Sequence, residues 1–144
     1  MNNALVKIDG KIYSKIEKGL VAFVGISEND DKETADFMCD KILNLRIFSD
    51  SNDKINLSLL DIDGDILMIS NFTLYADCSH GRRPNFLKAA KPDMASELFD
   101  YSVNVLKNKV KNIKTGVFGA DMKVELLNDG PVTIILDSDE IMKK

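Results

Sequence analysis

The chain has 144 residues, of which 44% are hydrophobic, and this is enough to bury the core of one compact domain spanning residues 1–144. Its formal net charge of −4 argues against a protein that coats nucleic acid through bulk electrostatics, so DNA is not an expected partner. No apolar run reaches the roughly 20 residues that span a bilayer, and no secretory signal is visible, so we expect a cytoplasmic protein without a membrane partner.

Three short strands and one helix are predicted in the first third of the chain. Residues 4–8, 11–16 and 20–26 have strand patterns, and Asp9-Gly10 between the first two is a two-residue hairpin signal. The chain is therefore expected to open with a meander. Between residues 31 and 45, apolar side chains recur at spacings of three and four, which predicts an amphipathic helix.

A buried strand and a second helix are predicted in the centre of the chain. The strand covers residues 65–72, and its unbroken apolar run at 66–69 is expected for a segment covered on both faces. A helical pattern follows Pro92 and is expected to stop near Val110. Together with closing strands at residues 114–117, 122–127 and 132–136, these elements predict an α+β domain with a curved, barrel-like β-sheet and two main helices.

Charge is distributed unevenly along the chain. Residues 28–65 hold eleven acidic and four basic side chains, whereas residues 80–123 hold nine basic and four acidic ones. The basic stretch can contact a polyanion locally, or its lysines can be no more than solvated helix faces. Composition alone leaves both interpretations open.

The predicted buried strand ends in four candidate site residues, Ser70, Asn71, Phe72 and Thr73. Backbone N–H groups near Phe72 and Thr73 can stabilise an oxyanion at such a strand end. Thr73 could instead attack an ester as a nucleophile, although the sequence shows no base to activate it. One histidine, two well-separated cysteines that are expected to be free thiols, and no clustered metal ligands favour chemistry without a metal or an organic cofactor.

Residues 81–86 place Arg82 and Arg83 in a turn, and guanidinium groups are well suited to bind phosphate or carboxylate. In the structural alternative, one arginine pairs with an acidic neighbour such as Asp77 and pins the loop. His80 lies in the same loop without a visible orienting partner, so a catalytic role for it is not expected.

Gly130-Pro131 is a second unusual element, because proline cannot donate to a strand ladder and glycine adopts backbone angles closed to other residues. One interpretation is an ordinary tight turn. In the other, a cis bond turns consecutive carbonyls the same way and presents two acceptors to a ligand amine. The sequence does not choose between the two isomers.

Four ordered segments closely resemble those of the D-aminoacyl-tRNA deacylase family. They are residues 70–77 (SNFTLYAD), 81–86 (GRRPNF), 116–122 (GVFGADM) and 128–133 (NDGPVT). The likeness runs with few gaps from about Asn3 to Ser138. Four motifs in order over almost the whole chain are far more specific than any one alone.

This resemblance implies a homodimer of compact barrel-like domains whose partner is a tRNA carrying a D-amino acid. It implies hydrolysis of the D-aminoacyl ester, with glycyl-tRNA as a further substrate and the tRNA 2′-hydroxyl activating the attacking water. Gly130 and Pro131 would be a cis dipeptide that enters the other subunit's pocket and rejects L-amino acids, with Thr133 in the same substrate-binding motif. Phe118 and Met122 would lie near the terminal adenosine.

The chain departs from the family pattern at two places. Asn71 stands where the family usually has glutamine, so a hydrogen bond from that side chain is expected to be lost or bridged by water. The sequence also starts after the family's usual first strand. These departures keep open the alternative of a weak or inactive dimeric module that binds aminoacyl-tRNA ends, and a trans Gly130-Pro131 bond with a different chiral preference would be a third possibility.

Overall fold

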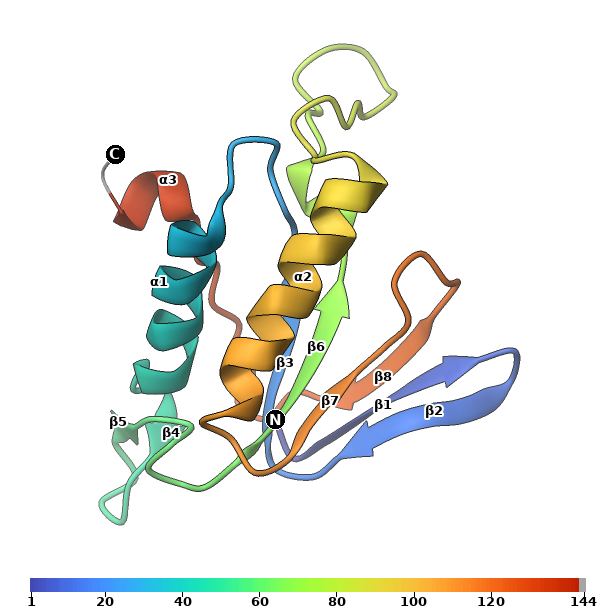
Figure 1. The fold of residues 1–144 in the computed structure, drawn as a ribbon. Coiled ribbons are helices and arrows are strands. Elements are labelled where there is room, and N and C mark those ends of the chain that lie inside the picture. Colours follow the sequence, from blue (N-terminus) through green and yellow to red (C-terminus); the bar gives the residue numbers. More distant parts are fainter. Residues whose placement is uncertain (143–144) are drawn as a thin grey trace.

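The first of two three-stranded sheets in the computed structural model, which describes residues 1–142, has the strand order β2-β1-β8 (Figure 1). Its strands β1 (Asn3–Ile8), β2 (Lys11–Ile16) and β8 (Lys123–Leu127) pair antiparallel. The β1–β2 hairpin closes through Asp9 and Gly10, which both have positive φ, at 52° and 78°. This is the conformation that a two-residue hairpin requires, and the predicted hairpin is confirmed.

The second sheet has the order β3-β6-β7 and is entirely parallel. It consists of β3 (Gly19–Val24), β6 (Asp65–Ser70) and β7 (Ile113–Thr115). Parallel neighbours need long crossover connections, and helices supply them here. A separate two-stranded sheet of β4 (Phe48–Ser49) and β5 (Ile55–Leu57) lies within the first crossover.

Helix α1 (Lys32–Asn44) connects β3 to β6, and helix α2 (Pro92–Lys107) connects β6 to β7. The Asp31 side chain caps α1 by accepting a hydrogen bond from the Thr34 amide at 2.9 Å, and Pro92 begins α2, where its missing N–H costs nothing. A 3-10 helix, η1 (Phe72–Tyr75), follows β6, and α3 (Ser138–Ile141) lies near the C-terminus. Both main helices agree with the predicted segments, and the α+β class is confirmed.

The core explains the apolar run of β6, because the strand is buried on both faces. Ile66 and Met68 pack toward the two helices, against residues such as Leu43 of α1 and Leu106 of α2. The side chains of Leu67 and Ile69 point to the other face of β6. There they pack against the first sheet, in a cluster with Ala4, Val6 and Ile16. Figure 1 shows the resulting layers, with α1 and α2 on one side of β3 and β6 and the β1–β2 hairpin on the other.

The structure differs from the predicted elements at three places. The opening segment is not a meander, since β3 leaves the β1–β2 hairpin and pairs in parallel with β6. The predicted strand at 65–72 ends at Ser70, where the chain turns into η1. Residues 132–136 are not a strand, because no described segment of the chain pairs with them and most of their side chains face solvent.

The helices of residues 1–142 are all too short or too polar to cross a membrane.

Candidate functional site

The carboxyl ends of the parallel strands bring several predicted site residues to one edge of the second sheet. The Asn71 amide donates to the Val24 carbonyl at 2.8 Å, which ties the turn after β6 to the end of β3. On the other side, the Gly116 amide donates to the Met68 carbonyl at 3.3 Å. The segments that follow β6 and β7 therefore leave the sheet at the same edge, the usual position of ligand sites in parallel sheets.

The turn after β6 exposes two backbone donors. The Leu74 amide donates to the Asn71 carbonyl at 3.3 Å, but within residues 1–142 the Phe72 and Thr73 amides have no acceptor. The first N–H groups of a helical turn lack partners inside the turn and remain available to a ligand. The Asn71 side chain does not cap them, because its Oδ1 accepts a hydrogen bond from the Thr73 hydroxyl at 2.5 Å.

Aromatic and apolar contacts fix this turn against the rest of the molecule. The ring of Phe72 packs edge-on against Phe86, with ring centroids 5.0 Å apart and an interplanar angle of 74°. Gly25, just after β3, lies so close that a Cβ there would be 3.1 Å from the Leu74 Cβ and 3.2 Å from the Tyr75 ring. Burial, with nearby carboxylates, raises the pKa of Tyr75 to about 12, so its hydroxyl stays neutral.

The predicted ion pair between Asp77 and a neighbouring arginine does not form. A backbone bridge between Asp77 and Asn85 closes the loop instead, and hydrogen bonds from Ser79 hold the pKa of the Asp77 carboxyl below its usual range. Because the loop is pinned by its backbone, Arg82 and Arg83 are exposed and without an ion pair among the described residues. Their guanidinium groups are free to contact an anion.

Phe118 and Met122 lie in the segment between β7 and β8. The ring of Phe118 contacts that of Phe99 in α2, with centroids 6.5 Å apart. The sulfur of Met122 lies directly over Gly116, where a Cβ would overlap it. Glycine at 116 therefore lets the Met122 side chain cross the end of β7, and both predicted residues come to the same edge as Phe72.

Gly130 and Pro131 form a turn that a neighbouring side chain bridges. Their peptide bond is cis, and Gly130 has a φ of 132°. The Asn128 side chain accepts from the Val132 amide at 3.2 Å and donates to the Thr133 hydroxyl at 2.9 Å. Asn128 was not among the predicted site residues, although an amide with both donor and acceptor groups beside a glycine turn is a signal that sequence can supply.

This turn lies far from Phe72 within one chain. The negative charge of Asp129 favours the protonated form of the Met1 amino group, so the two groups lie near each other. The Met1 amino group donates a hydrogen bond of 3.1 Å to the carbonyl of Gly19, at the start of β3. Gly19 pairs with Asp65 at the beginning of β6, whereas Phe72 follows the end of that strand. A six-residue strand spans roughly 20 Å, so a single copy does not bring the two motifs together (Figure 1).

Metal or thiol chemistry gains no support from the described residues. Residues 1–142 contain no group of three or more histidine, cysteine, aspartate or glutamate side chains that could hold a metal ion. Cys39 and Cys78 are both free thiols, as predicted. Burial raises the pKa of Cys39 to about 11, so this thiol is neutral and unreactive.

Comparison with known proteins gives a match over almost the whole chain. The family model described as D-Tyr-tRNA(Tyr) deacylase matches residues 1–137. A D-aminoacyl-tRNA deacylase of Thermosipho africanus (strain TCF52B) is 50% identical over 141 residues, which cover 98% of this chain and 95% of that protein. One from Clostridium botulinum (strain 657 / Type Ba4) is 53% identical over 133 residues, covering 92% of this chain and 89% of that protein.

Two solved structures have a similar fold. A protein named c-Myc DNA Unwinding Element Binding Protein is 36% identical, with a TM-score of 0.91 over 95% of this chain and 93% of that one. A probable eukaryotic D-amino acid tRNA deacylase gives a TM-score of 0.77 over 91% of both chains. Its identity is 16%, so this second likeness concerns the fold alone.

Proposed function

This chain belongs to the D-Tyr-tRNA(Tyr) deacylase family and is a D-aminoacyl-tRNA deacylase, and we propose that it reads the chirality of its substrate in a site shared between two copies. The reaction is hydrolysis of the ester that joins a D-amino acid to the 3′ end of tRNA. The free amino acid and the tRNA are the products. Because tRNA is the substrate, the proposal includes the expected cytoplasmic location.

The amides of Phe72 and Thr73 are the proposed oxyanion donors. Both N–H groups lack an acceptor among the described residues, and both follow a strand that is buried on each face and therefore rigid. A fixed donor aimed at the charge that develops during ester hydrolysis lowers the barrier, and losing one typically costs about 3 to 4 kcal/mol. This pair of free amides is the observation that carries the proposed catalytic site.

A nucleophilic role for Thr73 receives less support. Its hydroxyl donates to Asn71 Oδ1, and an amide oxygen does not remove a proton as a general base does. We therefore assign activation of the attacking water to the tRNA 2′-hydroxyl, as the family resemblance implies. Asn71 takes the place of the usual glutamine, and its role here is to hold the Thr73 side chain beside the amides.

Gly130 and Pro131 are proposed to complete the site of a second copy. Within one chain they lie at the opposite end of β6 from Phe72, so two copies must meet for the motifs to face each other. Main-chain carbonyls of this turn would fix the substrate's amino group, and an L side chain would then collide with backbone. Such a filter rejects every L-amino acid and needs no pocket for a particular D side chain, so glycyl-tRNA would also be accepted.

Exposed apolar side chains are consistent with a homodimer. They include Leu126, Leu127, Val132, Ile134 and Ile135. All five flank the Gly130-Pro131 turn in sequence, and solvent exposure of a run of large aliphatic side chains typically marks an interface. Thr133 lies in the same segment and is proposed to contact the substrate together with the turn.

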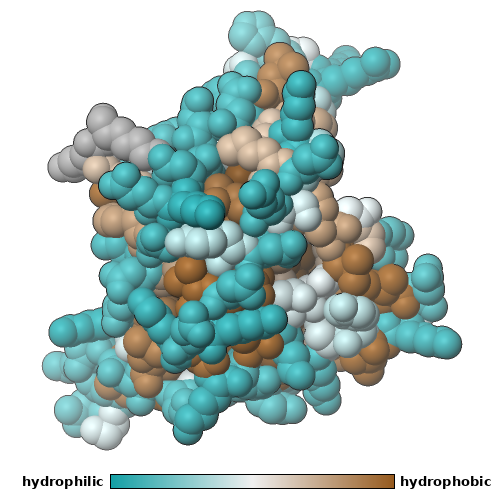
Figure 2. Space-filling model, viewed as in Figure 1, coloured by the Kyte–Doolittle hydropathy of each residue, from teal (hydrophilic) through white to brown (hydrophobic). Residues whose placement is uncertain are grey.

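Phe118 and Met122 are proposed to hold the terminal adenosine. An aromatic ring and a polarisable thioether are suitable surfaces for a base to stack on. Figure 2 shows hydrophobic side chains on the side of the molecule where Figure 1 places β2 and the segment after β7. Phe118, which lies in that segment, is 36% exposed. The net charge of −4 disfavours extended binding to duplex DNA, so an RNA end is the proposed partner.

Release of labelled tyrosine from D-tyrosyl-tRNA and L-tyrosyl-tRNA tests the whole proposal. We expect rapid release from the D-substrate and none above background from the L-substrate. Binding of both without release would indicate a non-catalytic module, and release of L-tyrosine would contradict the chiral filter. Thr73→Ala should retain most activity, and its near-complete loss in a folded variant would support the nucleophile model instead.

A further inference from the structure

A cavity lies beside the proposed adenosine site, between α2 and the strands β2 and β7. Its volume is about 550 Å³, within the usual range for small-ligand sites. Six of its lining side chains bear on its chemistry: Tyr13, Asp100, Asn104, Lys107, Lys114 and Phe118. Since Phe118 lines this cavity and is proposed to hold the adenosine, the two sites are continuous.

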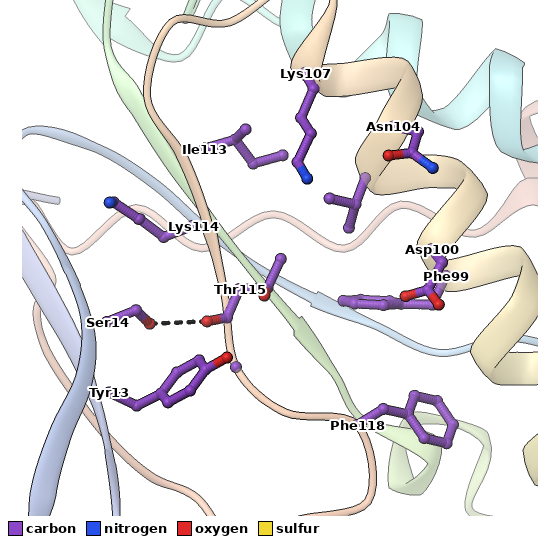
Figure 3. Close-up of a pocket in the computed structure, with 12 residues that line it drawn as sticks. Tyr13, Ser14, Phe99, Asp100, Asn104, Lys107, Ile113, Lys114, Thr115 and Phe118 are labelled. Atoms are coloured by element: carbon purple, nitrogen blue, oxygen red, sulfur yellow. Dashed lines mark hydrogen bonds between the residues drawn. The ribbon is translucent and has the colours of Figure 1, made fainter.

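The cavity is locally basic in an acidic chain. Figure 3 shows Lys107 extending from α2 into the space and Lys114 extending from β7 toward β2. Neither lysine forms an ion pair among the described residues, whereas Lys7, Lys111 and Lys123 do. Because the cavity has one acidic lining residue, Asp100, against two lysines, it favours an anion.

The same cavity offers surfaces for nucleobases. Tyr13 on β2 is 56% exposed, and in Figure 3 its ring stands at the wall opposite Asn104. A hydrogen bond from the Ser14 hydroxyl to the Thr115 carbonyl, 2.9 Å long, joins β2 to β7 and holds that wall in place. An exposed aromatic ring and a side-chain amide are the groups that proteins use to stack on unpaired bases and to bind their edges.

We propose that this cavity binds the nucleotides that precede the terminal adenosine of tRNA, an inference that rests on the proposed function. Lys107 and Lys114 contact phosphates of the single-stranded 3′ end, and Tyr13 stacks on a base. With the ester directed at the Phe72 turn and the adenosine at Phe118, the preceding nucleotides continue away from the site of chemistry. The cavity between α2 and β2 is the charged space along that direction.

Two substrates separate this subsite from the catalytic centre. D-tyrosyl-tRNA has the full 3′ end, whereas the D-tyrosyl ester of adenosine has the terminal nucleoside alone. The double variant Lys107→Gln/Lys114→Gln is compared with Lys54→Gln/Lys109→Gln, which removes the same charge from exposed lysines outside the cavity. All four positions are exposed, so both variants should fold normally.

We expect the cavity variant to raise KM for D-tyrosyl-tRNA at least about tenfold, with kcat unchanged, and the control variant to change it little. Cleavage of the adenosine ester should be unaffected in both. The slope of log(kcat/KM) against log salt should fall by about 1.4 in the cavity variant, since each lost single-strand phosphate contact removes about 0.7.

Equal KM values for the two double variants on D-tyrosyl-tRNA would overturn the subsite and leave the deacylase function intact. A parallel loss on the adenosine ester would also overturn it, because the lysines would then act on the catalytic centre. Failure of the unmodified protein on both substrates would instead contradict the proposed function itself.

Discussion

The turn after β6 and the turn after β8 carry the two motifs of the proposed site, and they differ in what holds them. Phe72 comes shortly after residues 66–69 of β6, which are at most 3% exposed and pack between two helices and the first sheet. Gly130 and Pro131 follow the edge strand β8, in a segment whose side chains are exposed. Hydrogen bonds of the Asn128 side chain with Val132 and Thr133 hold this turn. In the proposed site, the chemistry therefore depends on an exposed turn held by a rigid buried strand, whereas recognition of chirality depends on a surface turn that a second copy would complete.

Removing the Phe72 amide is expected to have the largest effect on activity. Phe72→Pro deletes this donor at the first position of η1, where proline is tolerated, and Asn71 already has the extended backbone that precedes proline, at φ −151° and ψ 91°. Phe72→Ala keeps the donor and is the matched control for the lost ring. We expect kcat to fall about 10²- to 10³-fold further in the proline variant, measured by D-tyrosine release. Equal rates would exclude the Phe72 amide as an oxyanion donor.

Core and surface substitutions should separate folding from assembly. Leu67→Ala opens a cavity at a fully buried position. We expect the free energy of unfolding, measured with urea, to fall by about 2 to 5 kcal/mol. Ile135→Ser changes a side chain that is 91% exposed, so the subunit's stability should be unchanged while the dimer weakens. Ultracentrifugation over a concentration series measures the second effect. A dimer of unaltered affinity would place the interface elsewhere.

Substitution at Gly130 tests the second motif directly. A Cβ there would meet the Val132 Cγ2 at 2.8 Å, and the φ of 132° disfavours any other residue. Gly10→Ala is the control, because alanine must also adopt a positive φ there, of 78°, but its methyl group meets no atom within 4 Å. We expect Gly130→Ala alone to lose about tenfold or more in D-tyrosine release and to admit L-tyrosine. Identical profiles for both alanine variants would contradict the chiral filter.

Mixing two damaged proteins shows whether the motifs act across subunits. A dimer of one Phe72→Pro chain and one Gly130→Ala chain has one intact composite site and one site damaged twice. After random exchange, about a quarter of the unmodified activity should return. If each chain held a complete site, mixing would restore nothing.

The smallest effect is expected at Asn128. Asn128→Ala removes the two hydrogen bonds that span the Gly130-Pro131 turn. A typical hydrogen bond contributes about 1 kcal/mol net. Because the turn is exposed and outside the core, thermal stability should change little while kcat/KM falls about fivefold. Thr133→Val loses one of these bonds, so its kcat/KM should lie between those of the unmodified protein and Asn128→Ala. An unchanged kcat/KM in both variants would indicate that the substrate itself orders the turn.

Local patterns in the sequence predicted the elements that short-range physics decides. The Asp9-Gly10 hairpin, both main helices and the doubly buried run of β6 are confirmed, since each depends on turn residues or on the period of apolar side chains. The strand predicted before the first motif extended two residues too far, because the chain turns into η1 at Phe72. The lysines of the cavity between α2 and β2 were missed, because the residues around them come from distant parts of the chain. Asn128 was also missed, although its partners Val132 and Thr133 lie close to it in the sequence.

Sequence by itself determined the family and the α+β class and supplied the residues of the proposed site, because composition, periodicity and motif order are properties of the chain alone. Tertiary structure decided the rest. It made β3 a parallel neighbour of β6, left residues 132–136 without a strand partner and put Gly130 at the opposite end of β6 from Phe72. Pairing and distance depend on which surfaces can be buried together, and no local pattern encodes that.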